Sequence, residues 1–406
     1  MWSMVLHTHE VPRLHQWTTR VSSSLSAMIQ SLLWLCLSTL LTVAGFAGAL
    51  PAAATVMEQQ GLSAGVIGVI TSLVYAGVLC MAPFQPRLAR RFGAVVTYQM
   101  GKVFSACGFT GLAFAHHAWV WSAATLCIGL GAGLTWPVTD SLVAAFAPED
   151  KKGAWMGLFQ TGMGAAFALG PFIASVVNPS AMFVTAAITG LVTSLPLLGR
   201  RVEVQGDASA PKEGLWDVLR MAPELPVLGF IGGFFENGTH TAITLSALAL
   251  NWNAAAAIAL AGVIGAGAFV VQYPIGKLAD TRGAHRIIVI TLLIMIASCL
   301  PLPLGGTMPW LLWVIAFVWG AAGGCLYTLA MTGMAQRFSG ARVLTATTIM
   351  VMSYTVGGIS GPAVAGYAVE WSPLMGPMAL FVIASLLGLL RRRPGAQIMS
   401  PSMDCG

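Results

Sequence analysis

The sequence predicts an all-α polytopic membrane protein with twelve transmembrane helices in two pseudo-symmetric bundles of six. Charged residues make up only 8% of the chain, far below the quarter that is usual for soluble domains. Apolar runs that are long enough to cross a hydrocarbon core of about 30 Å as helices recur along the whole length. Short motifs from the first part of the chain also recur in the second part.

The predicted spans follow one another with short polar connections. Each is an apolar run of about 20 residues or more, which is the length that a helix needs to cross a bilayer. The twelve spans are 28–50, 63–84, 95–115, 118–146, 153–177, 180–199, 224–250, 253–276, 286–305, 308–335, 344–369 and 372–390.

The basic residues predict the orientation of these spans. With both termini in the cytoplasm, the inner segments contain all but one of the 20 Lys and Arg residues, as the positive-inside rule requires. The exception is Lys102, which lies inside the third span. Tryptophans gather at the predicted outer ends, where amphipathic rings prefer to lie: Trp119, Trp121, Trp252, Trp310, Trp313 and Trp371. The net charge of +6 therefore reflects topology, and we expect no nucleic-acid partner.

A polar stretch divides the chain into two sets of six spans. Residues 199–224 read GRRVEVQGDASAPKEGLWDVLRMAPE, which is mixed in charge and short for a domain. We interpret 200–223 as a cytoplasmic linker with a surface helix near Leu215–Met221. The predicted organisation is then a cytoplasmic tail (1–27), an N-terminal bundle (28–199), the linker, a C-terminal bundle (224–391) and a second cytoplasmic tail (392–406).

The two sets of spans resemble each other in sequence. Pro86–Ala94 (PRLARRFGA) aligns with Gly276–Ala284 (GKLADTRGA) at an offset of 190, and Gly170-Pro171 matches Gly361-Pro362 at an offset of 191. Two matches at nearly the same offset, in corresponding loops and spans, are hard to obtain by chance. Six-span repeats of this kind build transporters whose binding site lies between the repeats, near the bilayer midplane.

These motifs also carry a family resemblance. GKLADTRGAHR, between the eighth and ninth spans, resembles the cytoplasmic G-x-L-A-D-R-x-G-R-R signature of the major facilitator superfamily. The segments APEDKKGAWMGLFQTGMG, GFFENG, VQYPIGKLAD and SYTVGGISGPAVAG are similar to those of its YcaD-like branch. The resemblance covers nearly all of 28–393. It implies the fold of that superfamily, transport by alternating access, and a protein that works as a monomer.

Two cytoplasmic loops carry the candidate gate. The carboxylate of Asp280 can pair with a nearby Arg or cap a helix N-terminus, and Gly276 and Gly283 allow close helix approach. The resemblance implies that this loop latches the two halves together in the outward-facing state. Arg90 stands at the position of Asp280 in the first copy, so a symmetrical latch is not expected. The alternative is a solvated loop that only obeys the positive-inside rule. The remaining gate candidates are Arg91, Arg282 and Arg286.

A polar cluster interrupts the seventh span. Glu236 falls near its midpoint, in GFFENGTHTAI, where an unpaired ionised carboxylate is costly in hydrocarbon. His240 lies one helical turn later on the same side, and Asn237 adds hydrogen-bonding groups. The resemblance implies that this span lines a central cavity, in which Glu236 would exchange protons or hold a cationic substrate. The alternative is a Glu–His pair that only fixes helix packing.

Asp140 is the acidic counterpart in the first half. It lies six residues before the inner end of the fourth span, and Lys102 lies seven residues after the inner start of the third. Antiparallel neighbours would place the two side chains at similar depth, so we expect a buried ion pair. Its role is either structural, since such pairs often only break even energetically, or one in coupling and substrate binding.

Other polar or aromatic side chains lie on spans that are expected to line the cavity. Each could equally serve in helix packing alone. These cavity candidates are Thr39, Trp136, Gln160, Gln272, Tyr327 and Tyr354.

The sequence thus predicts a secondary active transporter of a small organic solute in the inner membrane. No Walker motif is present, so neither a cofactor nor direct use of ATP is expected. The acidic residues favour proton coupling, with export of a neutral or cationic compound by proton antiport. The alternatives are a proton-independent facilitator, a metabolite importer of the same fold, and a copper transporter, suggested by 20 Met residues that are also ordinary core fillers.

Overall fold

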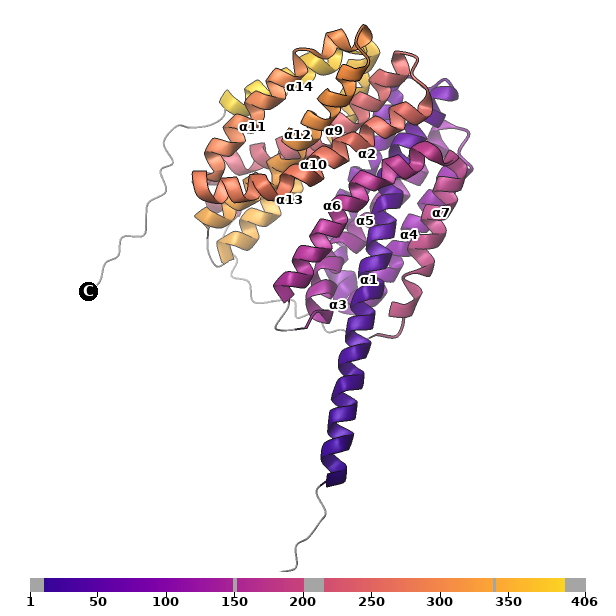
Figure 1. Ribbon diagram of the computed structural model, residues 1–406, viewed down its shortest axis with the longest axis vertical. Coiled ribbons are helices and arrows are strands. Elements are labelled where there is room, and N and C mark those ends of the chain that lie inside the picture. The colour runs from indigo at the N-terminus through magenta and orange to yellow at the C-terminus, as the bar shows by residue number, and fades with distance from the viewer. Residues whose placement is uncertain (1–10, 149–151, 201–214, 339–340, 391–406) are drawn as a thin grey trace, which may run out of the picture.

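The computed structural model describes residues 11–148, 152–200, 215–338 and 341–390, which form helices and no strand (Figure 1). The first half of the described chain contains α1 (Val11–Gln59), α2 (Ala64–Met81), α3 (Gln85–Phe92), α4 (Ala94–Ala113), α5 (Ala118–Phe146), α6 (Lys152–Val176), α7 (Pro179–Val192) and the 3-10 helix η2 (Leu195–Leu197). The second contains α8 (Leu215–Met221), α9 (Glu224–Ala249), α10 (Ala254–Arg282), α11 (Ala284–Cys299), the 3-10 helix η3 (Leu302–Gly306), α12 (Trp310–Arg337), α13 (Ala341–Trp371) and α14 (Met375–Leu390).

Eight helical segments are long and apolar enough to cross a membrane: α1, α2, α5, α6, α7 continued through η2, α10, α12 and α13. The apolar helices α11 and α14 have only 16 residues each. Polar side chains, among them Lys102 in α4 and Glu236 in α9, lower the hydropathy of the other two. Each of these twelve helices overlaps one predicted span, although the number of spans itself stays a prediction. The surface helix predicted at Leu215–Met221 is confirmed as α8.

The first helix differs from its predicted bounds. We predicted a span over 28–50 after a tail, but α1 is one helix from Val11 to Gln59 with Pro51 inside it. Proline removes one backbone hydrogen bond and crowds the preceding turn. Helix packing outweighs this effect here, because the alanines that follow Pro51 are almost fully buried against neighbouring helices. Residues 201–214 of the linker and the predicted tail 392–406 lie outside the described residues.

Two other predicted spans were too long as single helices. The segment 180–199 divides into α7 and η2, and the segment 286–305 divides into α11 and η3. Pro196 and Pro301 lie at these breaks. Proline lacks the N–H that would continue the helical hydrogen bonds, so the chain tightens into a short 3-10 turn instead.

The two halves repeat the same helix contacts. Gly170 of α6 lies against the backbone of Ala44 in α1, and Gly361 of α13 lies in the same way against Phe234 in α9. The two loop copies agree as well, since Gly93 and Gly283 both end a helix with positive φ, 87° and 85°. This left-handed conformation favours glycine. The repeat seen in the sequence is therefore a repeat of structure.

The halves meet along two helix pairs, α2 with α13 and α6 with α10. In Figure 1 they come together at the end away from the N-terminal part of α1, which the topology prediction places outside. Gly68 lies against the carbonyl of Pro362 there, and Gly265 lies against Ala168. The ends that are predicted to lie outside are therefore packed against each other.

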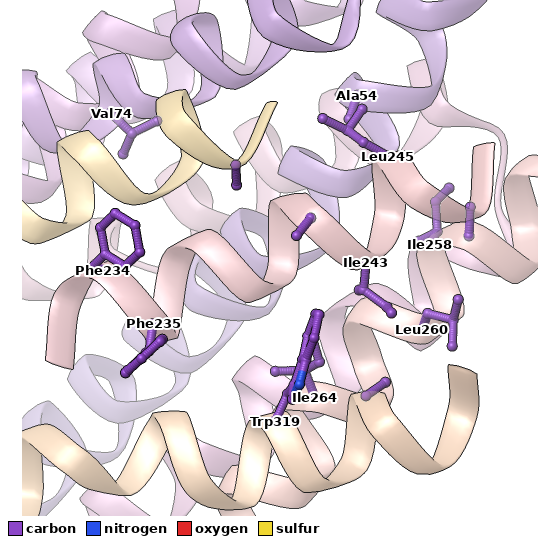
Figure 2. Close-up of a cluster of buried hydrophobic side chains, with 14 of the residues drawn as sticks. Ala54, Val74, Phe234, Phe235, Ile243, Leu245, Ile258, Leu260, Ile264 and Trp319 are labelled. Carbon is purple, nitrogen blue, oxygen red and sulfur yellow. The ribbon is translucent and has the colours of Figure 1, made fainter. Parts of the chain in front are cut away.

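A continuous apolar core joins helices of both halves (Figure 2). Ala54 and Val74 come from the first half, and Phe235 and Trp319 come from the second. The ring of Phe381 in α14 lies with its centroid 5.0 Å from that of Trp319 and 5.7 Å from that of Phe235. These aromatic contacts hold α9 against α12 and α14.

Helices α9 and α13 cross with their backbones in contact. Gly233 lies against the carbonyl of Tyr354, and Gly357 lies against the carbonyl of Phe230. Small residues at membrane helix interfaces allow this close approach, and no Cβ fits at either position. The crossing fixes where the residues after Gly233 stand relative to α13.

Replacing Gly357 by Ala should force α9 and α13 apart, because a Cβ at this position would overlap the carbonyl oxygen of Phe230. Overpacking of this kind costs about 1–3 kcal/mol, so we expect Gly357→Ala to lower the midpoint of thermal unfolding in detergent. Gly157→Ala is the matched control, because a Cβ at Gly157 meets nothing within 4 Å. Equal midpoints for the two variants would contradict the close crossing.

Candidate functional site

Glu236 lies at the midpoint of α9, a helix of 26 residues. The preceding Phe235 is fully buried in the aromatic core. Each residue turns about 100° around a helix axis, so Glu236 and Asn237 point away from that core and remain only half-buried. Among the described residues, no Lys or Arg forms an ion pair with Glu236. A carboxyl group without a cationic partner is thus held, partly accessible, in the middle of the bundle.

Two tyrosines of the second half stand beside this carboxyl group. The Tyr354 hydroxyl of α13 lies close to the side chains of Glu236 and Asn237. The Tyr327 ring of α12 is tilted against that of Tyr354, with the centroids 4.7 Å apart. Both cavity candidates are half-buried, so the structure brings them together with Glu236 as one polar and aromatic group.

A tyrosine of the first half completes the group. The Tyr75 hydroxyl of α2 donates a hydrogen bond to Oδ1 of Asn237, whose Nδ2 donates to the carbonyl of Gly233 at 2.9 Å. Asn237 therefore connects the two halves. Tyr75 was not among the residues predicted from the sequence. Its signal was a phenol in the middle of an apolar span, where the hydroxyl requires a partner.

His240 lies one turn beyond Glu236 and is half-buried. The described residues show no hydrogen bond to its side chain and no ion pair with Glu236. The Glu–His pair that the sequence allowed is not formed in this structure, and a role for His240 in coupling stays a prediction.

The position in α1 that corresponds to Glu236 carries Phe46, at the repeat offset of 190. The Phe46 ring packs edge-on against Trp136 at 6.0 Å and against Phe167 at 6.3 Å, measured between ring centroids. Trp136 thus belongs to a core contact of the first half. An apolar ring satisfies the fold at this position, so packing alone does not require the carboxyl group of Glu236.

A second polar group lies towards the predicted inner end. Asp140 and Gln160 are both exposed, with Oδ1 and Nε2 3.5 Å apart. Gln272 is exposed on the facing helix α10, and its Nε2 lies 3.4 Å from the hydroxyl of Thr328. These residues come from both halves, but no described hydrogen bond connects them with Glu236.

The expected ion pair between Lys102 and Asp140 is not formed. Lys102 is 2% exposed, and its Nζ donates to the carbonyl of Ser38 at 3.1 Å and to the hydroxyl of Thr42 at 2.6 Å. The prediction was wrong in depth and in rotation. Gly101 lies against Gly131, Leu134 and Thr135 of α5, so Lys102 is more than one helical turn from the level of Asp140. Because Gly101 faces α5, the next residue is turned about 100° away, towards α1.

Thr39 lies in the same network of the first half. Its hydroxyl is 2.9 Å from that of Tyr98, and Thr39 is 3% exposed. Lys102 Nζ lies over the Tyr98 ring, 4.8 Å from the ring centroid. The structure therefore places Thr39 between α1 and α4 and not beside Glu236.

The candidate gate lies at the predicted inner ends. Arg90 and Arg91 are exposed on α3. Arg282 and Arg286, on either side of Gly283 in the second copy, are exposed as well. A Cβ added at Gly276 would have no neighbour within 4 Å. The side chain of Asp280 lies outside the described residues. The latch expected from the resemblance therefore stays a prediction.

No group of three or more His, Cys, Asp or Glu side chains in the described ranges is arranged as metal ligands would be. What the geometry around Glu236 offers instead is an acidic group between aromatic rings. Such a group can bind a proton or hold an organic cation against the rings.

Comparisons with known proteins agree on one family. A model of the Major Facilitator Superfamily matches residues 35–307 and 227–402. An uncharacterised MFS-type transporter of Enterobacter sp. (strain 638) is 26% identical over 319 residues, which cover 75% of this chain and 80% of that protein. The uncharacterised MFS-type transporter YcaD of Escherichia coli (strain SMS-3-5) is 26% identical over 315 residues, covering 76% of this chain and 80% of that protein.

Solved structures of other proteins are similar to this chain in fold. The crystal structure of the nucleoside transporter NupG is similar with a TM-score of 0.71 at 14% identity, covering 89% of this chain and 96% of that one. At this identity the likeness concerns the fold alone. It matches the arrangement of two helix bundles described above.

Removing the Tyr75 hydroxyl should weaken the contact between the halves. Tyr75→Phe leaves Oδ1 of Asn237 without this donor, and the loss of one hydrogen bond to a partly buried group destabilises by about 1–3 kcal/mol. We expect a lower midpoint of thermal unfolding than for Tyr273→Phe, the matched control, whose ring is 81% exposed. If both variants unfold like the wild type, the hydrogen bond contributes nothing to the contact.

Proposed function

Because the chain belongs to the Major Facilitator Superfamily, in its YcaD-like branch, we propose that this multi-pass membrane transporter exchanges a small organic solute for protons at Glu236. The solute is neutral or cationic and partly apolar, and it leaves the cell. In this proposal the protein lies in the inner membrane with both termini in the cytoplasm, and it works as a monomer.

One observation carries this proposal. A carboxyl group without an ion-pair partner among the described residues stays partly accessible at the midpoint of α9, although its equivalent in α1 is the packed ring of Phe46. Ionisable groups deep in a membrane are costly and usually serve a function. The cost of Glu236 is therefore offset by a role that packing does not explain.

The chemistry of the group is compatible with exchange. Ionised Glu236 attracts a cationic solute, and the rings of Tyr327 and Tyr354 provide an apolar and cation-binding wall. Protonated Glu236 no longer has that charge, so the proton and the cation compete for one group. Such competition couples the proton flux to the cation flux, because the transporter changes sides only when the proton or the cation is bound. Asn237 and Tyr75 supply hydrogen bonds that orient the solute.

Glu236→Gln should abolish solute-driven proton flux. In inside-out vesicles with an imposed pH gradient, a panel of organic cations and neutral solutes is added, and collapse of the gradient is followed with a pH-sensitive dye. We expect a responding solute to act on the wild type and not on Glu236→Gln, since the amide cannot carry the proton. Glu58→Gln makes the same chemical change at an exposed outer position and should respond like the wild type.

Three outcomes are separable in this experiment. An equal response of both glutamine variants would assign Glu236 a structural role. Solute movement that needs no pH gradient, yet is lost in Glu236→Gln, would identify a facilitator. Collapse of the gradient on solute addition to right-side-out vesicles only would favour an importer.

The dependence on membrane potential tests whether Glu236 is the single exchanging group. One carboxyl group exchanges one proton for one monovalent cation, which moves no net charge. With ethidium as the test cation, we therefore expect the rate of uptake to increase with the pH gradient. The rate should not change with a membrane potential set by valinomycin and potassium. Uptake that rises with the potential would require a second proton, with Asp140 the next group to test.

A further inference from the structure

We infer that Glu370 latches the outer ends of the two halves by capping the first turn of α2 across their interface. The Glu370 side chain belongs to α13 of the second half, and its Oε2 accepts a hydrogen bond of 2.9 Å from the backbone N–H of Gly65 in α2. This role goes beyond the proposed function, because it concerns the closing of the outer side and not the exchange at Glu236.

The position of Gly65 makes this contact an electrostatic one. It is the second residue of α2, where backbone N–H groups have no acceptor within their own helix and the helix dipole attracts negative charge. A carboxylate that accepts such an N–H is a charge-assisted hydrogen bond, stronger than a neutral one. Here the acceptor comes from the opposite half, so the bond exists only while the outer ends are together.

The corresponding helix of the second half is capped differently. Helix α10 uses its own Asn253, whose Oδ1 accepts from the N–H of Ala256 at 2.8 Å. The cap that α2 has within its own half is weaker, since Ser63 Oγ lies 3.5 Å from the N–H of Val66. At the repeat offset of 191, the counterpart of Glu370 is Pro179, which has no carboxylate. The latch is thus present at one of the two seams between the halves.

The residues around this hydrogen bond are closely packed. A Cβ on Gly65 would meet both Glu370 Oε2 and the ring of Tyr367 at 2.5 Å, and Gly366 lies against the backbone of Ala64. At the other seam the contact is apolar, with the ring of Phe172 lying against Gly262. Separation of these ends therefore breaks the charged contact of Glu370 with Gly65.

Alternating access gives this bond a function. A transporter of this fold must separate its outer ends in each cycle by rocking one bundle against the other. Breaking the bond between Glu370 and Gly65 adds to the free energy of that step. Glu370 is accordingly a positioning residue, which biases the equilibrium between outward-closed and outward-open states without touching the solute.

The test measures the distance between the outer ends directly. Spin labels are attached to cysteines introduced at His116 and Met308, which are exposed in outer loops of opposite halves, after the seven native cysteines are replaced. Distance distributions from double electron–electron resonance then give the ratio of molecules with open outer ends to molecules with closed outer ends. The experiment uses the full chain in lipid nanodiscs, with no solute and no pH gradient, so its result is independent of coupling at Glu236.

We expect Glu370→Gln to raise the ratio of open to closed molecules about threefold, because the amide still accepts the hydrogen bond but lacks the charge. Glu370→Ala removes the acceptor and should raise the ratio about tenfold or more. Glu58→Gln, an equal loss of charge at an exposed outer site, should leave the ratio unchanged. The unfolding midpoint of each variant is recorded alongside.

A second control separates the latch from ordinary helix capping. Asn253→Ala removes a cap that lies within one half, so it should lower the unfolding midpoint and leave the ratio of open to closed molecules unchanged. An unchanged ratio in both Glu370 variants would overturn the inference. So would an equal change in ratio for Asn253→Ala or Glu58→Gln, because the effect would then not depend on a contact between the halves.

Discussion

The candidate site depends on the backbone contact between α9 and α13. In a bilayer, apolar side chains gain little by leaving lipid for one another, so membrane helices associate through close packing. Gly233 and Gly357 permit this packing because neither has a Cβ. The contact places Tyr354 next to Glu236 and holds it there. A larger residue at either glycine would separate the phenol from the carboxyl group even with both residues unchanged.

The architecture is duplicated, whereas the chemistry is not. Gly170 makes with Ala44 the contact that Gly361 makes with Phe234, so both halves use the same way of joining their helices. At the position of Glu236, however, the first half has a packed aromatic ring. The same asymmetry recurs at the outer end, where one helix of the repeat is capped within its own half and the other across the interface. The repeat thus supplies a rigid frame, and single substitutions on it supply the polar groups.

Much of the fold followed from the sequence, because apolar length and basic loops determine membrane helices almost alone. Helix α8 was predicted from the sequence of the linker. Tyr354 was predicted only as one of several cavity candidates, and its place beside Glu236 was not. Contacts that depend on rotation about a helix axis could not be predicted. Lys102 faces α1 and not the helix of Asp140, and Glu370 was indistinguishable from any charge at the end of a span. The end of α1 could not be predicted from Pro51 either, since the helix continues to Gln59 because the residues after Pro51 are buried.

The hydrogen bond from Tyr75 to Asn237 joins the central group to the seam between α2 and α13. Thermodynamic linkage gives this bond a consequence that works in both directions. A ligand that takes the place of Tyr75 at Asn237 makes opening of the outer side easier by some factor. The open state must then bind that ligand more tightly than the closed state, by the same factor. The affinity for such a ligand and the position of the conformational equilibrium are therefore coupled, so a residue far from Asn237 that shifts this equilibrium also changes the affinity.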